Sequence, residues 1–249
     1  MLKHGLIALA LTLAPVAAQA QPADVAAAVS APGRPEAAVA LDAGRKPAEV
    51  LAFGGLQRGA RALDLFTGSG YYGEIMARAV SPQGSVVGWN PSQFVGDDDR
   101  QTLAAVHQRS ANFTAIDSRP EAISLPADSF DFAMINLNYH DAYFTSARSG
   151  FRMEPAPFLQ AVFQSLKRGG TIVVIDHVAN PGGDTRQVVD ALHRIDPATI
   201  RADFERAGFV FDGESPILRN PGDDHSKGVF DPAIQGRTDR VVYRFRKPA

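Results

Sequence analysis

The sequence contains no cysteine, and this absence excludes several kinds of site at once. Without thiols there is no disulfide, thiolate nucleophile, zinc–thiolate centre or lipidated cysteine. A surplus of one charge is also missing, because 25 Lys and Arg stand against 27 Asp and Glu, for a net charge of −2. This balance gives no electrostatic reason to expect nucleic acid or an anionic membrane as partner. No serine nucleophile elbow occurs either, which argues against a hydrolase. The sequence leaves the oligomeric state open.

One apolar run stands out, at the N-terminus. Lys3 and His4 precede the apolar residues 5–14, and small residues follow at Ala18 and Ala20. This pattern predicts a secretory signal peptide over residues 1–20, cleaved after Ala20, and hence a periplasmic or secreted protein. The run is too short for a membrane-spanning anchor, so we expect no membrane contact after cleavage.

Residues 21–35 are rich in Ala, Pro and Gly, which predicts a flexible leader. From residue 36 the sequence becomes helical, and Pro47 is well placed to begin a second helix. We expect residues 36–249 to form a single domain that begins with these helices. Its length suffices for one large α/β core.

The stretch 60–73 has the pattern strand, tight turn, helix. The apolar run 63–66 stops at the turn 67–70, and residues 72–80 are compatible with a helix. Glycine at 68 and 70 permits backbone angles that a Cβ atom disfavours, and lets a ligand approach the main chain. Amide groups at the start of the following helix would face that ligand.

These glycines do not by themselves identify the ligand. Gly68, Gly70 and Gly73 satisfy G-x-G-x-x-G, the fingerprint of dinucleotide-binding domains, so a nicotinamide cofactor and another nucleoside both remain open. An ordinary glycine-rich turn is a third reading. Asp64, within the strand, is expected either to hold polar groups of the ligand or to tie down the turn.

Residues 63–70, Leu-Asp-Leu-Phe-Thr-Gly-Ser-Gly, resemble the first motif of class I S-adenosylmethionine-dependent methyltransferases. In that family an acid in the first strand precedes a G-x-G turn that backs the methionine part of the cofactor. This chain departs from the commonest form because a phenylalanine stands where a further glycine is usual. The resemblance covers about residues 40–249 and is closer to a bacterial group of predicted methyltransferases with export signals. It implies S-adenosylmethionine as cofactor, at a site that includes Asp64, Phe66, Thr67, Gly68 and Gly70.

The remaining chain predicts the other strands of one sheet. Apolar runs occur at 85–89, 112–116, 130–137 and 171–175, and the final candidates are 209–211 and 240–245. The run Leu-Lys-x-Gly-Gly-Thr at 166–171 is typical of class I methyltransferases and less typical of dehydrogenases. We expect a single-domain Rossmann-like methyltransferase fold of the α/β class. Its seven-stranded sheet would be mostly parallel, with a C-terminal antiparallel pair.

Further cofactor contacts are expected where three of these strands end. Asn90 lies where Rossmann dehydrogenases and methyltransferases usually keep an acid for the ribose hydroxyls. After the third strand, the resemblance implies that a polar residue touches the adenine. Asp117, Ser118 and Arg119 are the candidates, and we retain Ser118 and Arg119 together with Asn136 at the end of the fourth strand.

Polar residues that could serve a methyl acceptor follow the fourth and fifth strands. Tyr139, His140 and Asp141 follow one strand and Asp176 and His177 the other, at the edge where parallel sheets bind ligands. The run Asn-Tyr-His-Asp at 138–141 also resembles a signature of the exported group. An acid beside a histidine raises its basicity and suits a general base.

Two other interpretations of these residues stay open. Aspartates and histidines could bind magnesium or manganese, as in catechol-type O-methyltransferases. No motif of fixed spacing supports that site, so a divalent metal is not favoured and we expect no metal ligands. The histidines could also be satisfied groups in buried loops.

The leading functional hypothesis is methyl transfer to an unknown small molecule. Such a reaction needs mainly placement, because the methyl group of the sulfonium cofactor is already activated. S-adenosylmethionine is made in the cytoplasm, so an exported chain favours one alternative: a periplasmic nucleoside-binding or regulatory module without transfer activity. A nicotinamide-dependent oxidoreductase is the other alternative.

Overall fold

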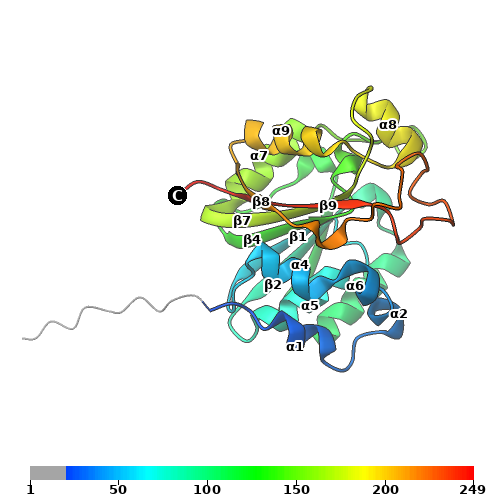
Figure 1. The fold of residues 1–249 in the computed structure, drawn as a ribbon. Coiled ribbons are helices and arrows are strands. Elements are labelled where there is room, and N and C mark those ends of the chain that lie inside the picture. The colour runs from blue at the N-terminus through cyan, green and yellow to red at the C-terminus, as the bar shows by residue number, and fades with distance from the viewer. Residues whose placement is uncertain (1–20) are drawn as a thin grey trace, which may run out of the picture.

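The computed structural model describes residues 21–249, and Figure 1 shows a central sheet between two layers of helices. The predicted signal peptide lies outside the described residues. The sheet has seven strands in the order β3-β2-β1-β4-β7-β9-β8. Its strands are β1 (Arg61–Leu65), β2 (Ser85–Pro91), β3 (Phe113–Ser118), β4 (Phe130–Asn136), β7 (Leu166–His177), β8 (Val210–Glu214) and β9 (Arg240–Arg246). A separate antiparallel pair consists of β5 (Thr145–Ser146) and β6 (Phe151–Arg152).

Strand directions confirm the predicted fold class. The neighbours β3, β2, β1, β4 and β7 are all paired in parallel. Strand β9 is antiparallel both to β7 and to β8. The structure is therefore an α/β fold whose mostly parallel sheet ends in an antiparallel pair, as expected.

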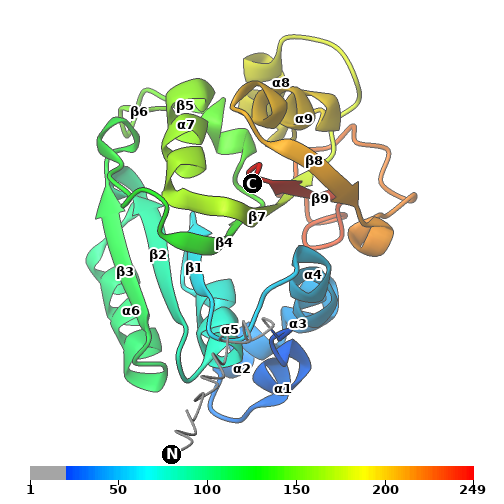
Figure 2. The same ribbon diagram turned by 90° about the vertical axis from the view of Figure 1, so that its left-hand side faces the viewer.

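Helices cover both faces of the sheet, which Figure 2 shows from a second direction. One face carries α1 (Val25–Ser30), α2 (Glu36–Val39), α3 (Asp42–Arg45), α4 (Pro47–Gly54), α5 (Tyr71–Val80) and α6 (Asp97–Arg109). The other face carries α7 (Pro155–Ser165), α8 (Thr185–Leu192) and α9 (Pro197–Arg206). No helix among residues 21–249 is long and apolar enough to cross a membrane.

Each face of the sheet has its own apolar core, as expected for parallel strands that are buried on both sides. Leu63 and Leu65 belong to the core beneath α7 and α9, whereas Ala62 belongs to the core beneath α5. Side chains alternate along a strand, so Asp64 is on the same face as Ala62. The acid of β1 is thereby placed under the turn that leads into α5.

The predicted flexible leader, residues 21–35, contains the ordered helix α1. Asp24 caps this helix by accepting a hydrogen bond from the Ala27 amide at 3.0 Å. Val25 and Ala28 are buried in the core beneath α5. Part of this Ala-, Pro- and Gly-rich segment is therefore ordered, because the alanine and valine side chains of α1 pack against α4 and α5.

Candidate functional site

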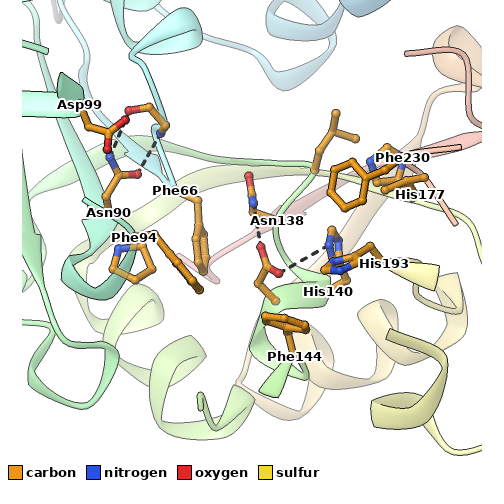
Figure 3. Close-up of a pocket in the computed structure, with 15 residues that line it drawn as sticks. Phe66, Asn90, Phe94, Asp99, Asn138, His140, Phe144, His177, His193 and Phe230 are labelled. Atoms are coloured by element: carbon orange, nitrogen blue, oxygen red, sulfur yellow. Dashed lines mark hydrogen bonds and ion pairs between the residues drawn. The ribbon is translucent and has the colours of Figure 1, made fainter. Parts of the chain in front are cut away.

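A cavity of about 480 Å³ lies where β1, β2, β4 and β7 end (Figure 3). Its size falls within the range of about 300–1,000 Å³ that is usual for small-molecule sites. The position is the one where open parallel sheets bind ligands. The cavity is lined by Phe66, Gly68, Asn90, Pro91, Phe94, Asp99, Leu137, Asn138, His140, Asp141, Phe144, His177, His193, Val229 and Phe230.

Only one glycine of the G-x-G-x-x-G pattern faces this cavity. Gly68 has φ +56°, and a Cβ atom built there would find no atom within 4 Å. A Cβ atom on Gly73 would lie 2.4 Å from the Phe113 ring, and one on Gly70 would lie 3.1 Å from Val106. Gly70 and Gly73 therefore allow helices and strands to pack closely, whereas Gly68 leaves room for a ligand.

Asp64 ties down the turn and does not line the cavity. The Thr67 hydroxyl donates a hydrogen bond to Asp64 Oδ2 at 2.6 Å, and both side chains are buried. Burial raises the pKa of Asp64 to about 7, while hydrogen bonds from Thr67 and from the Gly73 backbone act in the opposite direction. Of the two roles expected for this acid, the geometry fits the structural one.

Phe66 has the backbone conformation that glycine adopts easily, with φ +55°. Its ring is held edge-on by Trp89 and Phe158, with ring centroids 5.2 and 5.8 Å away. Such aromatic packing offsets the cost of a left-handed non-glycine residue, about 1–2 kcal/mol. In Figure 3 the ring stands in the cavity wall between Asn90 and Asn138.

The tyrosines that follow the turn leave the cavity free. The Tyr71 hydroxyl donates to Asp42 Oδ1 at 2.6 Å, and the Tyr72 hydroxyl donates to the Arg45 carbonyl at 3.2 Å. Both rings therefore point toward the N-terminal helices. The space beside Gly68 stays open.

Asn90 lines the cavity and also clamps the turn. Its Oδ1 accepts a hydrogen bond from the Gly68 amide at 2.9 Å, and its Nδ2 donates one to the Gly68 carbonyl at 3.1 Å. The amide that replaces the usual acid thus holds the glycine in place. Any hydrogen bond to a ribose would use the remaining lone pair or proton of the same side chain.

Four other predicted cofactor contacts lie away from the cavity lining. Thr67 is bonded to Asp64, as described above. Ser118 Oγ accepts a hydrogen bond from Trp89 Nε1 at 2.9 Å. Arg119 is exposed and pairs with Glu121 at 2.5 Å. Asn136 ends β4 at a position paired with Ile175 of β7, and the cavity begins with the next residue of the chain.

The opposite side of the cavity is built around a buried His140–Asp176 pair. His140 Nδ1 lies 2.7 Å from Asp176 Oδ1, and the His140 amide donates to Oδ2 of the same carboxylate at 2.7 Å. The two residues are 4% and 0% exposed. A carboxylate only accepts hydrogen bonds, so Nδ1 carries the proton toward Asp176 and Nε2 is the other ring position.

Charge determines how His140 titrates. Burial by itself lowers its pKa, but the carboxylates of Asp176 and Asp141 outweigh that effect and raise it to about 9. The pKa of Asp176 is lowered: burial raises it, and the charge and hydrogen bonds of His140 more than compensate. A buried ion pair results, with the imidazole between two acids.

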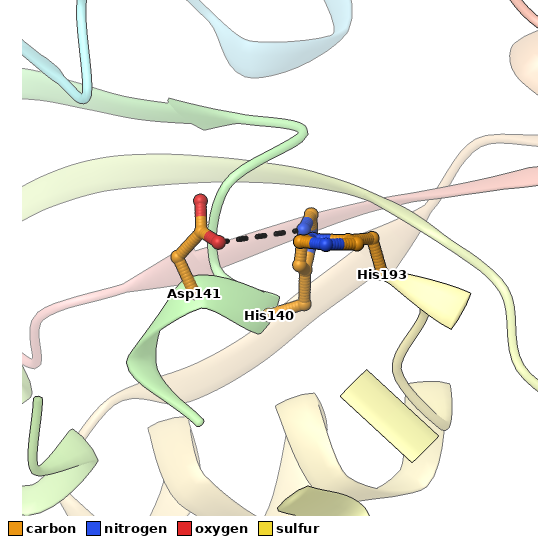
Figure 4. Close-up of side chains that lie close together, drawn as sticks. All are labelled: His140, Asp141 and His193. Carbon is orange, nitrogen blue, oxygen red and sulfur yellow. Dashed lines mark ion pairs between the residues drawn. The ribbon is translucent and has the colours of Figure 1, made fainter. Parts of the chain in front are cut away.

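Asp141 completes this side of the cavity. Asn138 Nδ2 donates a hydrogen bond to Asp141 Oδ2 at 2.8 Å. The other oxygen, Oδ1, lies 3.6 Å from His140 Nε2 (Figure 4). The amide therefore orients a carboxylate that faces the imidazole.

His177 lines the cavity as a neutral ring. Its Nδ1 lies 2.6 Å from Thr238 Oγ1, and its amide donates to Asp176 Oδ1 at 2.7 Å. Burial lowers its pKa to about 3 despite the neighbouring Asp176 carboxylate.

Tyr139, expected beside the acceptor, does not line the cavity. It is 0% exposed, and its hydroxyl donates to Asp203 Oδ2 at 2.7 Å. The chain enters a short 3-10 helix, His140–Ala142, directly after this residue. That turn directs Tyr139 into the core beneath α9 and His140 toward the cavity.

His193 is a cavity residue that sequence reasoning missed. It caps the C-terminus of α8 with φ +51°, and its ring centroid lies 5.5 Å from that of His140 and 5.0 Å from that of Phe144. Asp196, three residues further along the chain, caps α9 by accepting a hydrogen bond from the Ala198 amide at 2.8 Å. No local signal identifies His193, because its neighbours come from distant parts of the chain.

Aromatic side chains at the cavity were also missed. Phe94 is 47% exposed and Phe230 is 65% exposed, although large apolar side chains are usually buried. Phe144 packs between Phe151 and His193. These rings give the cavity an apolar rim around its polar groups.

Backbone strain concentrates at this cavity. Six non-glycine residues within 21–249 have positive φ, and three of them, Phe66, Leu137 and His193, line the cavity. Such residues cost about 1–3 kcal/mol each and cluster at functional sites. These three strained residues therefore line the same cavity as His140.

Part of the chain matches one known protein family. Residues 28–120, less than half of the chain, match the family described as protein-L-isoaspartate(D-aspartate) O-methyltransferase. A search of curated proteins finds no match.

Solved structures share the fold at low identity. An S-adenosylmethionine-dependent methyltransferase from Aquifex aeolicus is 19% identical, with a TM-score of 0.57 over 80% of this chain and 88% of that chain. One from Mesorhizobium loti is also 19% identical, with a TM-score of 0.57 over 83% of this chain and 100% of that chain. The cyclase SpnF is 18% identical, with a TM-score of 0.59 over 83% and 81% of the two chains. The chain thus has the S-adenosylmethionine-dependent methyltransferase fold, and fold alone does not decide the reaction.

Proposed function

We propose that this protein transfers a methyl group from S-adenosylmethionine to a small-molecule acceptor bound beside His140. The observation that carries the proposal is a single cavity that reaches from the open face of Gly68 to the His140–Asp176 pair. The family match over residues 28–120 includes the glycine turn. When bound, S-adenosylmethionine would supply a methyl group on a positively charged sulfur.

The described residues fit such a cofactor. Gly68 leaves open space at the turn, Asn90 presents an amide, and Phe66 supplies an apolar wall between the two halves of the cavity. These three residues would hold the cofactor. Asp64 would act indirectly, by fixing the turn.

His140 and Asp141 would serve the acceptor. At neutral pH, a ring with a raised pKa carries a proton on Nε2 and donates a hydrogen bond. The Asp141 carboxylate, 3.6 Å away, accepts one. An acceptor hydroxyl or amine could therefore be held by a donor and an acceptor at once, with its proton directed toward Asp141.

Asp176 would be a positioning residue for this pair. It is fully buried and contacts His140 at both the ring and the backbone. The rim formed by Phe94, Phe144 and Phe230 favours an acceptor with an apolar or aromatic body.

The two alternative functions receive less support. A nicotinamide oxidoreductase is not favoured, because the antiparallel β9 and β8 at the end of the sheet match methyltransferase structures. A binding or regulatory module would use the same fold and cavity, and only a transfer assay separates it from an enzyme.

Titration calorimetry with S-adenosylmethionine, S-adenosylhomocysteine and NADH tests this proposal. We expect both adenosyl compounds to bind and NADH not to bind. Methyl transfer is then sought by mass spectrometry of metabolites incubated with protein and methyl-labelled cofactor. Binding without transfer to any metabolite would favour the binding module, and NADH as the sole ligand would favour the oxidoreductase.

We also propose that the chain belongs with the exported methyltransferase-like group and works outside the cytoplasm after cleavage behind Ala20. Its basis is the N-terminal sequence pattern alone. Mass spectrometry of the protein from a periplasmic fraction should give a chain that begins at Gln21. An intact Met1 on a protein confined to the cytoplasm would contradict it.

A further inference from the structure

We propose that His140, Asp141 and His193 form a binding site for one divalent transition-metal ion. Each residue offers one ligand atom, and these three atoms lie within 4.8 Å of one another (Figure 4). Two imidazoles and one carboxylate are a ligand set that proteins use for zinc, iron, manganese and related ions. All three residues line the same cavity.

The surroundings of His140 are those of a metal ligand. Ligating histidines commonly donate the second ring N–H to a carboxylate, which fixes the tautomer and the orientation of the ring. Asp176 is that carboxylate: its Oδ1 lies 2.7 Å from His140 Nδ1, and the residue is fully buried. The Nε2 atom is thereby left to face Asp141, at 3.6 Å. His140 is itself 4% exposed, so this polar atom has little access to solvent.

The other two ligands are also held in place. Asn138 donates to one oxygen of Asp141 at 2.8 Å, which directs the second oxygen toward the imidazole. His193 lies at the end of α8, where its left-handed backbone is a conformation that favours glycine. Phe144 and Phe230 contact its ring at centroid distances of 5.0 and 5.1 Å. These two aromatic neighbours therefore hold the imidazole beside His140.

The donor atoms also select the kind of ion. Magnesium and calcium prefer oxygen ligands, whereas two nitrogens and one oxygen favour zinc, manganese, iron or cobalt. Three protein ligands beside an open cavity resemble catalytic rather than structural metal sites, which are closed by a fourth protein ligand. A ligand nitrogen must be free of its proton, so the ion would replace the proton on His140 Nε2. If the proposed methyl transfer is correct, an oxygen of the acceptor could then occupy the open position. The metal site itself does not depend on that function.

The test measures metal binding directly. Protein without a histidine tag is treated with chelator, dialysed and titrated by calorimetry with zinc and with manganese. We expect one ion per chain for at least one metal, and a visible absorption spectrum when cobalt is added. Asp141→Asn and His193→Asn should each weaken binding at least about tenfold, because each removes one ligand. Asparagine is chosen at 193 because it tolerates a positive φ.

His107→Ala is the matched control. This histidine is exposed on α6 and lies outside the cavity, so its removal should leave metal affinity unchanged. Circular dichroism checks that every variant is folded. The proposal is overturned if folded wild-type protein binds none of the three ions, or if both ligand variants keep wild-type affinity.

A parallel titration with S-adenosylhomocysteine separates this proposal from the proposed function. Metal binding without S-adenosylhomocysteine binding would support the metal site and contradict the proposed methyltransferase function. S-adenosylhomocysteine binding without metal binding would support the proposed function and contradict the metal site.

Discussion

The two sides of the cavity are built in different ways. On the glycine-turn side, polar groups satisfy one another: Thr67 bonds to Asp64, and Asn90 bonds to both main-chain groups of Gly68. On the histidine side, buried Asp176 orients His140, and polar atoms remain directed toward the cavity.

This difference indicates that the two sides of the cavity have different roles. The turn side offers a shaped surface and few free polar atoms, as expected where a ligand is held mainly by fit to the main chain. The histidine side holds charged groups and ligand atoms that are directed toward the cavity, as expected where a reacting group or an ion is held. Variants on the two sides should therefore affect stability and ligand binding in different proportions.

The largest expected effect is that of Asp176→Ala. It removes a buried carboxylate that accepts hydrogen bonds from the His140 ring and amide and from the His177 amide. Losing one partner of a buried ion pair costs about 3–5 kcal/mol, because the remaining buried charge loses its nearest counter-charge. Urea denaturation at neutral pH measures the change in the free energy of unfolding.

Asp176→Asn is the control for this change, because it keeps the size and one acceptor oxygen and should cost less. A loss under about 1 kcal/mol in the alanine variant would show that the pair contributes no support. The histidine side would then no longer differ from the turn side in this respect.

A second prediction concerns the pH dependence of stability on the turn side. Burial raises the pKa of Asp64 to about 7, while the unfolded carboxyl titrates near about 4. Between these values the unfolded chain loses its proton and the folded chain keeps it. The free energy of unfolding should therefore fall as pH rises from about 4 to 7, by at most about 4 kcal/mol, and then level off.

Asp64→Asn removes this titration and leaves all other groups in place. The difference in the free energy of unfolding between the variant and the wild type should shift in favour of the variant across that pH window. Denaturation curves at several pH values measure the shift. Parallel pH profiles for the two proteins would mean that the hydrogen bonds from Thr67 and Gly73 keep Asp64 ionised in the fold.

The smallest expected changes in stability come from two glycines of the turn side. Gly73→Ala places a Cβ atom 2.4 Å from the Phe113 ring and should cost about 1–3 kcal/mol through overpacking. Gly68→Ala meets no atom within 4 Å and should cost only the strain of its φ, about 1–2 kcal/mol. Denaturation measures both variants.

The two glycine variants should rank in the opposite order in their effect on ligand binding. We expect Gly68→Ala to weaken S-adenosylhomocysteine binding at least about tenfold, because the methyl group enters the space that a ligand would use. Gly73→Ala should bind almost as well as the wild type where it is folded. Equal losses of affinity in the two variants would show that Gly68 has no special access to the ligand.

Much of the fold was predictable, because its signals are local. Apolar runs and turn residues predicted the seven strands of the sheet. The helix α1 was not predicted, since its order depends on contact with α4 and α5. Tyr139 was expected beside the acceptor, and the structure buries it in the core, because the residue order does not show which way a side chain points before a 3-10 helix.

The sequence by itself determined the glycine turn, the α/β class and the presence of His140, Asp141 and Asp176 at strand ends. Those features follow from neighbouring residues and from a parallel sheet that gathers its carboxyl ends at one edge. The tertiary structure alone decided that Asn90 supports the turn, that Asp176 is buried behind His140, and that His193 joins the cavity. Each of these depends on contacts between residues far apart in the chain, which no local pattern encodes.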